Sequence, residues 1–497
     1  MLARELQLSA DDLIDALLRL DAARRVQILD SGGARGPEAR FLIAGFDPFE
    51  TIEARGLALH IQVRDPLNVR QIESADVLGA LDERLSKYSV SGAARASRPV
   101  SGACFATFSY ELAHRFERLR SRSHAQAETN AREPDAVLSF YDTLVIHDYK
   151  RSATEVVSVA GPERLNQAWE IINESASLFQ TRERRAKNDE SSRFFPQGSR
   201  LQDLSNNAFA STAVSNFTRD QYLTAVERIK EHIAAGDIYQ ANLTQQFCVR
   251  LDARLSPERV FLNLRRDHPA SFAAFLRRRE DVVVSASPER FLQVSLEADG
   301  GRAIEAWPIK GTRPRGLSAD EDDCLRAELR ASEKDRAENV MIVDLLRNDI
   351  GRVCRYGSVV VRELFTVQEH PTLFHLVSKV RGQLREEATA GSILRATFPC
   401  GSITGAPKIR AMEIIDEIEP APRGLSMGAL GYFSFDGAID LNVAIRTMTI
   451  KDGLARFNTG GGIVADSDPA LEYEESLTKA RALLRALGVG EMNCRQK

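Results

Sequence analysis

Cysteine is scarce in this sequence, and long hydrophobic runs are absent. The six cysteines are scattered over 497 residues, with no Cys-x-x-Cys pair and no cluster of cysteine and histidine. This distribution is typical of a protein kept in a reducing compartment, and it argues against a disulfide scaffold and a zinc site. Nowhere do 18 apolar residues run together, so we expect no transmembrane helix.

A strong charge of either sign is also missing. Lys and Arg total 66 against 70 Asp and Glu, for a formal net charge of -4. This balance argues against non-specific binding to nucleic acid or to an anionic membrane. Near the start of the chain, Glu5, Asp11 and Asp12 interrupt the apolar core that a signal peptide needs. The sequence therefore predicts a cytoplasmic protein whose partners are small molecules or other proteins.

The composition, 43% hydrophobic and 27% charged, is that of a large folded protein, and the length exceeds one ordinary domain. Segments 41–50, 100–111 and 136–149 are rich in β-branched and aromatic residues and predict strands. A polar, charged stretch then separates this sheet-rich part from the rest. We predict an amino-terminal lobe over 1–180, a connector over 181–215 and a second domain over 216–490.

The second domain opens with a well-marked helix and strand. Thr218 and Gln221 form a capping-box pair, and Gly236 suits the carboxy-terminal cap of the same helix. In the strand predicted over 238–251, Tyr239 is expected on the apolar face, whereas Gln240 lies on the opposite face, which is rich in amides.

Two further predicted helices carry acids. Ser332 caps a helix that places Glu338 beside an apolar run, and a helix from Asp468 to near Gly488 aligns Glu472, Glu475 and Lys479 at spacings of three and four. Such stripes are most often solvated faces with weak surface ion pairs. The alternative is that Glu338 and Glu475 converge on a hard cation such as Mg²⁺, which needs few protein carboxylates.

Glycine-rich segments at 307–316, 400–418 and 457–469 offer backbone N–H groups to an anion. In the second of them, Pro407 fits the first turn of a helix whose positive end would face Ser402 to Ala406. None of the three has the spacing of a dinucleotide-binding or Walker motif, so tight turns are the other interpretation.

An ordered set of motifs resembles the chorismate-utilising enzyme family. It includes SASPERF, PIKGTRPRG, ENVMIVDLLRNDIGR, GSITGAPKIRAMEIIDEIEP and NTGGGIVADSDP, and it is strongest over 217–487. The resemblance implies an α+β fold of the anthranilate synthase type, two-lobed, with packed antiparallel β-sheets flanked by helices. It also implies that 216–490 is the chorismate-binding catalytic domain and 1–180 the family's variable lobe.

Within the family, a few positions favour the aminodeoxychorismate synthase branch. Lys310 in PIKGT is similar to the nucleophilic lysine of that branch, where anthranilate synthases usually have alanine. Gln240 stands where the water-adding isochorismate and salicylate synthases have a base lysine, so the resemblance disfavours water activation. The first component of anthranilate synthase is the alternative.

The resemblance assigns roles to further residues. Glu289 would act as general acid, Lys310 as nucleophile, and His375 as an active-site histidine, whose other interpretation is a hydrogen-bonded residue on a strand. Magnesium would be the cofactor, held by Glu338 and Glu475. The substrate-binding positions would be Gln240, Gly311, Thr312, Arg446, Gly460, Gly461 and Gly462.

The implied reaction replaces the 4-hydroxyl of chorismate by ammonia, a step toward 4-aminobenzoate and folate. A glutaminase would need a Gly-x-Cys-x-Gly nucleophile elbow, and no cysteine here has that context. We therefore expect ammonia from a separate glutamine amidotransferase subunit. A lysine must lose its proton before it attacks, and Arg313 and Arg315 are the cations nearest to Lys310 in sequence.

Overall fold

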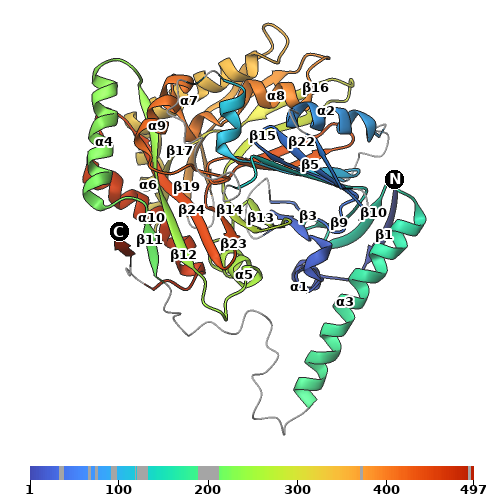
Figure 1. The fold of residues 1–497 in the computed structure, drawn as a ribbon. Coiled ribbons are helices and arrows are strands. Elements are labelled where there is room, and N and C mark those ends of the chain that lie inside the picture. Colours follow the sequence, from blue (N-terminus) through green and yellow to red (C-terminus); the bar gives the residue numbers. More distant parts are fainter. Residues whose placement is uncertain are drawn as a thin grey trace.

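The structure is a computed structural model, and it describes residues 1–32, 39–64, 69–72, 76–90, 98–117, 119, 133–188, 212–369, 373–490 and 494–496. Two large β-sheets form its centre, and helices cover their outer surfaces (Figure 1). The helices are α1 Ala10–Leu18, α2 Val77–Lys87, α3 Pro162–Asn188, α4 Arg219–Ala234, α5 Pro257–Asp267, α6 Ala319–Ala331, α7 Glu333–Gly351, α8 Ala390–Thr397, α9 Lys408–Ile418 and α10 Pro469–Ala486.

The first sheet has 13 strands among the described residues. In spatial order they are β1 Leu2–Leu6, β10 Ala153–Ser158, β9 Thr143–Asp148, β3 Phe41–Gly45, β2 Gln27–Asp30, β13 Phe272–Arg277, β14 Val282–Ser287, β23 Thr447–Lys451, β24 Leu454–Ile463, β12 Gln240–Arg250, β11 Ala213–Ser215 and β25 Cys494–Gln496, with β20 Gly405–Ala406 beside β12. Its described pairs are antiparallel except β11 with β25.

The second sheet has 12 described strands, all paired antiparallel. In spatial order they are β17 Ile309–Pro314, β19 Leu373–Gln383, β16 Arg302–Ala306, β15 Arg290–Leu296, β22 Ile439–Val443, β21 Ala429–Ser434, β7 Ala103–Phe108, β8 Ala136–Tyr141, β4 Glu50–Arg55, β5 Ala58–Val63 and β6 Val69–Ile72, with β18 Val360–Glu369 beside β19. Together with the helices, the two sheets confirm the predicted α+β class.

Both sheets combine strands from 1–180 and from 216–490. In the first, β2 pairs with β13, and in the second, β7 pairs with β21. Backbone hydrogen bonds therefore join the two parts of the chain. Most of the predicted connector lies outside the described residues; its described parts are the end of α3 and the strand β11.

The helix ends agree with the sequence signals because capping is a local interaction. Thr218 and Gln221 form the predicted capping box, and the side chain of Ser332 accepts a hydrogen bond from the backbone of Asp335. The prediction for Tyr239 is wrong. The strand β12 begins at Gln240, so Tyr239 lies just before it, and its side chain is 72% exposed instead of joining the apolar face.

Apolar faces of the sheets and helices form the cores. The largest cluster of buried residues lies around Phe108, Phe291, Phe398 and Phe433, and α7 adds Ile342 and Leu346 to it. Phe398, which ends α8, contacts the rings of Phe108, Phe116 and Phe291. These contacts fix α8 against the second sheet. This packing holds α7 against β17 and β19, which carry predicted site residues.

The cysteines and the helices agree with the compositional expectations. Five cysteines of the described chain are free thiols: Cys104, Cys248, Cys324, Cys354 and Cys400. No described helix is both long enough and apolar enough to cross a bilayer.

Candidate active site

Lys310 lies on β17 at an irregularity in the pairing with β19. The register shifts between Ile309 and Thr312, so Lys310 and Gly311 form a bulge, and Gly311 has a φ of 83°. A β-bulge turns a side chain away from its regular direction, and left-handed backbone favours glycine. The Lys310 ammonium lies 3.9 Å from a carboxylate oxygen of Glu338 on α7, and both side chains are largely buried.

Glu289 is a buried carboxyl group in the short link between β14 and β15, with an exposed fraction of 7%. Burial raises its pKa to about 7, although a hydrogen bond from Ser402 and the charges of Lys310 and Lys479 act in the opposite direction. At neutral pH, Glu289 therefore exists in comparable amounts with and without its proton, as a general acid requires.

Helix α10 brings a third carboxylate to Lys310. Glu475 forms an ion pair of 2.7 Å with Lys479, whose ammonium also donates to the carbonyl oxygen of Gly460 at 2.9 Å. Burial alone would raise the pKa of Glu475, but the charges of Lys479, Lys334 and Lys310 together lower it. Glu475 is therefore held as a carboxylate although it is half-exposed.

The glycine run of β24 lets α10 and β12 approach closely. A Cβ atom at Gly460 would lie 1.8 Å from the carbonyl oxygen of Leu243, and one at Gly461 would lie 3.4 Å from the Glu475 carboxylate. At Gly462 it would lie 2.2 Å from the amide nitrogen of Gln240. The three glycines thus leave open a space that any side chain would fill.

Gln240 is almost completely buried, with an exposed fraction of 1%. Neither its amide nitrogen nor its amide oxygen has a hydrogen-bond partner among the described residues. A buried amide without partners costs free energy, so such a group is a candidate for contact with a ligand or water.

Thr312 and His375 lie opposite each other on β17 and β19, close to Lys310 in the sheet. The Thr312 hydroxyl and the Nδ1 atom of His375 are 3.0 Å apart, which is a hydrogen-bond distance. His375 is buried, with an exposed fraction of 8%. The structure therefore joins two of the predicted residues by a direct contact.

Arg446 follows β22 in a left-handed conformation, with a φ of 48°. Its carbonyl oxygen accepts a hydrogen bond from Ala286 at the end of β14. Its guanidinium has no hydrogen bond or ion pair within the described chain, and burial lowers its pKa. An uncompensated, partly buried guanidinium is suited to bind a carboxylate from outside the protein.

The structure also brings in side chains that the sequence analysis did not single out for the site. Lys334 on α7 acts electrostatically on Glu475 and on Glu472, whose pKa is raised mainly by burial. Lys334 lies four residues before Glu338 on one helix face, a spacing that could have identified it. We call the following residues the lysine–carboxylate cluster: Lys310, Lys334, Lys479, Glu289, Glu338, Glu472 and Glu475.

The surroundings of Lys310 differ from its neighbourhood in the sequence. Lys310 lies within the strand β17. The arginines that follow it are occupied elsewhere: Arg313 pairs with Glu328 at 2.8 Å, and Arg315 contacts Asp322 at 2.8 Å. The ion partner of Lys310 is instead Glu338, at 3.9 Å.

The donor set of the cluster suits a hard cation only in part. Glu338 and Glu475 offer carboxylate oxygens near Lys310. No group of three or more metal-ligating side chains is found in the described ranges. Mg²⁺ retains several waters and often takes only one or two protein carboxylates, so these two glutamates are compatible with it provided that water and substrate supply the other oxygens.

The fold and the cluster define a class of protein: an enzyme whose site combines a carboxyl group that can donate a proton, an amine and an unpaired guanidinium for an anionic substrate. A family model for chorismate binding enzymes matches residues 29–485. The chain belongs to this family. Its substrate class is therefore chorismate.

Individual relatives fall into two branches of the family. Aminodeoxychorismate synthase component 1 of Escherichia coli (strain K12) is 37% identical over 469 residues, covering 94% of each chain. Anthranilate synthase component 1 of Bacillus caldotenax is 35% identical over 94% of this chain and 89% of its own. The crystal structure of anthranilate synthase component I from Streptococcus pneumoniae TIGR4 superposes with a TM-score of 0.71 at 28% identity, covering 97% of this chain and 99% of that one. The predicted fold type is confirmed.

Proposed function

We propose that this chain is the chorismate-binding component of an aminodeoxychorismate synthase and acts in the cytoplasm. It would replace the 4-hydroxyl of chorismate by ammonia to form 4-amino-4-deoxychorismate. The observation that carries the proposal is the position of Lys310, whose amine lies in a bulge of β17 and faces Glu338. The similarity to aminodeoxychorismate synthase component 1 supports the same branch.

Hydroxide is a poor leaving group, so the reaction needs a proton donor. Glu289 would transfer its carboxyl proton to the 4-hydroxyl, which leaves as water, while the neutral Lys310 amine forms a bond to C2 of the ring. The added amine then loses a proton. Ammonia attacks C4, the ring double bonds shift back toward C2, and the C2–N bond breaks with its electron pair on the Lys310 nitrogen, which takes up the proton that the new amine at C4 gives up.

The remaining residues would bind and orient the substrate. Arg446 would form a paired hydrogen bond with one carboxylate, and the glycines of β24 would leave space for the ring beside Gln240. His375 and Thr312 would fix the wall next to Lys310. Glu338 and Glu475 would hold Mg²⁺, which when bound neutralises charge on the ring carboxylate.

Ammonia would come from a separate glutamine amidotransferase subunit. The Escherichia coli relative is named component 1, which itself refers to one part of an assembly. Free ammonium should replace that subunit in the test, because ammonia needs no base to act as a nucleophile.

The competing function is that of anthranilate synthase component I. The 35% identity to such an enzyme supports this alternative. It shares the substrate, but ammonia adds at C2 and pyruvate is lost. Lys310 favours aminodeoxychorismate formation because the other reaction has no step for a nucleophilic lysine.

The deciding experiment incubates the chain with chorismate, Mg²⁺ and ammonium chloride. We expect no anthranilate fluorescence, and 4-aminobenzoate only after a lyase is added.

Lys310→Ala should reduce product formation by at least about 10²-fold, while Lys451→Ala, at an exposed ion pair on β23, serves as the control. Direct appearance of anthranilate would reject the proposal.

A further inference from the structure

A cavity of about 310 Å³ lies where the link between β13 and β14 meets β4, β5 and β8. Gln27 of the first sheet and Glu53 and His60 of the second line it, together with Arg25, Arg278 and Arg279 from the links between strands. None of the predicted active-site residues, all of which the structure describes, is part of its wall. The cavity is therefore distinct from the lysine–carboxylate cluster.

Arg25 provides a positive charge that the described protein does not pair. It follows a short 3-10 turn, Ala22–Arg24, in a left-handed conformation with a φ of 49°. Its guanidinium donates to the side-chain oxygen of Gln62 at 2.6 Å, but no carboxylate of the described residues lies within ion-pair distance. Burial, with the like charge of Arg279, lowers the pKa of Arg25. A strained, partly buried residue of this kind often marks a functional site.

The other charges around the cavity do not cancel this excess. Arg278 forms a two-point ion pair with Asp281, in which its Nε and Nη2 atoms donate at 2.6 and 2.7 Å. Glu53 is bound by Arg55 at 2.6 Å. Both pairs are therefore neutral, and they leave Arg25 and Arg279 as the uncompensated charges.

Arg279 itself has only a weak local partner. Its guanidinium is 3.7 Å from Glu280, and that carboxylate also contacts Lys451 at 2.8 Å and Arg55 at 3.3 Å. Because Arg55 is already paired with Glu53, Glu280 is left to balance both Arg279 and Lys451, and one carboxylate cannot balance two cations. Arg279 is half-exposed at the rim, so it is accessible to a ligand.

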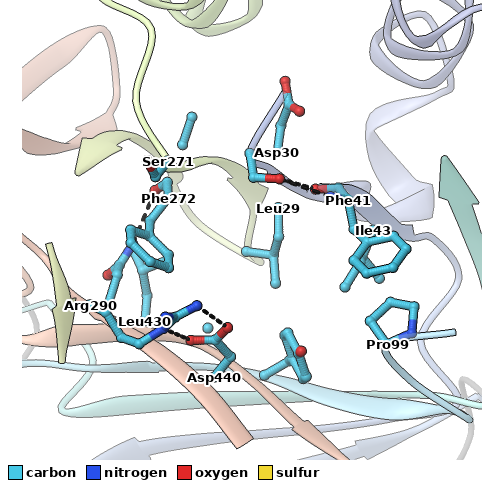
Figure 2. Close-up of a pocket in the computed structure, with 15 residues that line it drawn as sticks. Leu29, Asp30, Phe41, Ile43, Pro99, Ser271, Phe272, Arg290, Leu430 and Asp440 are labelled. Atoms are coloured by element: carbon cyan, nitrogen blue, oxygen red, sulfur yellow. Dashed lines mark hydrogen bonds and ion pairs between the residues drawn. The ribbon is translucent and has the colours of Figure 1, made fainter. Parts of the chain in front are cut away.

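The cavity in Figure 2 provides a contrast within the same fold. Its volume is about 100 Å³, and apolar side chains such as Leu29, Ile43 and Leu430 line much of it. Its arginine, Arg290, is paired with Asp440 through two contacts of 2.9 and 3.1 Å, as the dashed lines show. That cavity has no unpaired positive charge, so a charge excess is not a general feature of the space between the sheets.

The ligand that fits the larger cavity carries concentrated negative charge. Arg25 and Arg279 lie close enough for one charge to act on the other, so a single doubly charged group satisfies both better than two separated carboxylates. Guanidinium groups bind phosphate oxygens in pairs. We propose that this cavity is a binding site for a phosphate dianion, free or as a small phosphate ester, held between Arg25 and Arg279.

The test is isothermal titration calorimetry of the full chain at fixed ionic strength, with inorganic phosphate and glycerol 3-phosphate as probes. Succinate is the comparison anion. We expect both phosphate probes to bind and succinate to bind more weakly, and the tighter of the two phosphates then identifies the source. Equal or tighter binding of succinate would overturn the proposal, as would the absence of binding by both phosphates at millimolar concentration.

Variants locate the site. Arg25→Gln and Arg279→Gln should each weaken phosphate binding by about tenfold or more, because each removes a charge-assisted contact. Arg254→Gln, at an exposed arginine paired with Asp252, is the matched control and should change nothing. Arg279→Gln alters a half-exposed side chain, so it remains informative if Arg25→Gln impairs folding. Loss of binding in Arg446→Gln with unchanged binding in Arg279→Gln would assign the phosphate to the candidate active site and refute the proposal.

Discussion

Replacing Glu289 by glutamine should separate catalysis from stability. Burial is the largest cause of the rise in its pKa, from 4.5 to about 7. The folded state therefore binds a proton that the unfolded state releases between these values, and the stabilising contribution present at low pH is lost as pH rises through about 7. Glu289→Gln removes the titrating group while keeping the shape of the side chain, so the stability of the variant should not fall in this way as pH rises.

The magnitude follows from the two pKa values. Linkage gives a cost for the ionisable side chain of about 2 kcal/mol at pH 6 and about 3.4 kcal/mol at pH 8.5. The free energy of unfolding of Glu289→Gln, measured relative to the unmodified protein, should therefore increase by about 1.4 kcal/mol between these pH values. Turnover of chorismate should fall by about 10²- to 10⁴-fold, because the proton donor is lost.

Urea unfolding at pH 6 and pH 8.5, paired with an ammonium-dependent turnover assay, measures both effects. Glu227→Gln, at a side chain on α4 that is 56% exposed, removes a carboxylate without burial and provides the control. A stability difference that stays constant with pH would refute the argument from burial. Unchanged turnover in Glu289→Gln would refute the proposed role as general acid.

Three other predictions concern single contacts in the site. Ser402→Ala removes a hydrogen bond that lowers the pKa of Glu289, so the falling limb of the pH–rate profile should move to higher pH; an unmoved limb would contradict this contact. Arg446→Gln should raise KM for chorismate by about tenfold or more with a smaller change in kcat, as initial rates would show. Glu338→Gln and Glu475→Gln should each raise the Mg²⁺ concentration for half-maximal rate by more than about tenfold, because even the loss of a partner that only orients a metal ligand lowers metal affinity by about this factor. An unchanged Mg²⁺ requirement would exclude the two glutamates as ligands.

Local features of this fold could be predicted from the sequence because neighbouring residues determine them. The caps at Thr218 and Ser332 depend on residues three positions away, and the structure contains both. The close approach at Gly461 is likewise indicated by a run of three glycines. These signals identify elements but not which elements meet.

The geometry of the site depends on contacts between distant segments, which periodicity does not reveal. Lys310, Glu338 and Glu475 come from β17, α7 and α10, and packing of these elements brings their charges together. Sequence proximity was misleading in the same region, because Arg313 turns toward Glu328. The resemblance to a family identified the residues, whereas the structure supplied their contacts.

The charges of the lysine–carboxylate cluster also bear on how ligands enter it. The three lysines of the cluster stand against Glu338, Glu472 and Glu475, and burial favours the neutral form of Glu289, so the formal charges of the cluster nearly balance without a ligand. Chorismate adds two negative charges, and Mg²⁺ adds two positive charges. Either ligand alone would leave an uncompensated charge in a partly buried site, which is costly, whereas both together restore the balance. We therefore expect the two to bind with positive coupling, and linkage requires that each raise the affinity of the other by the same factor.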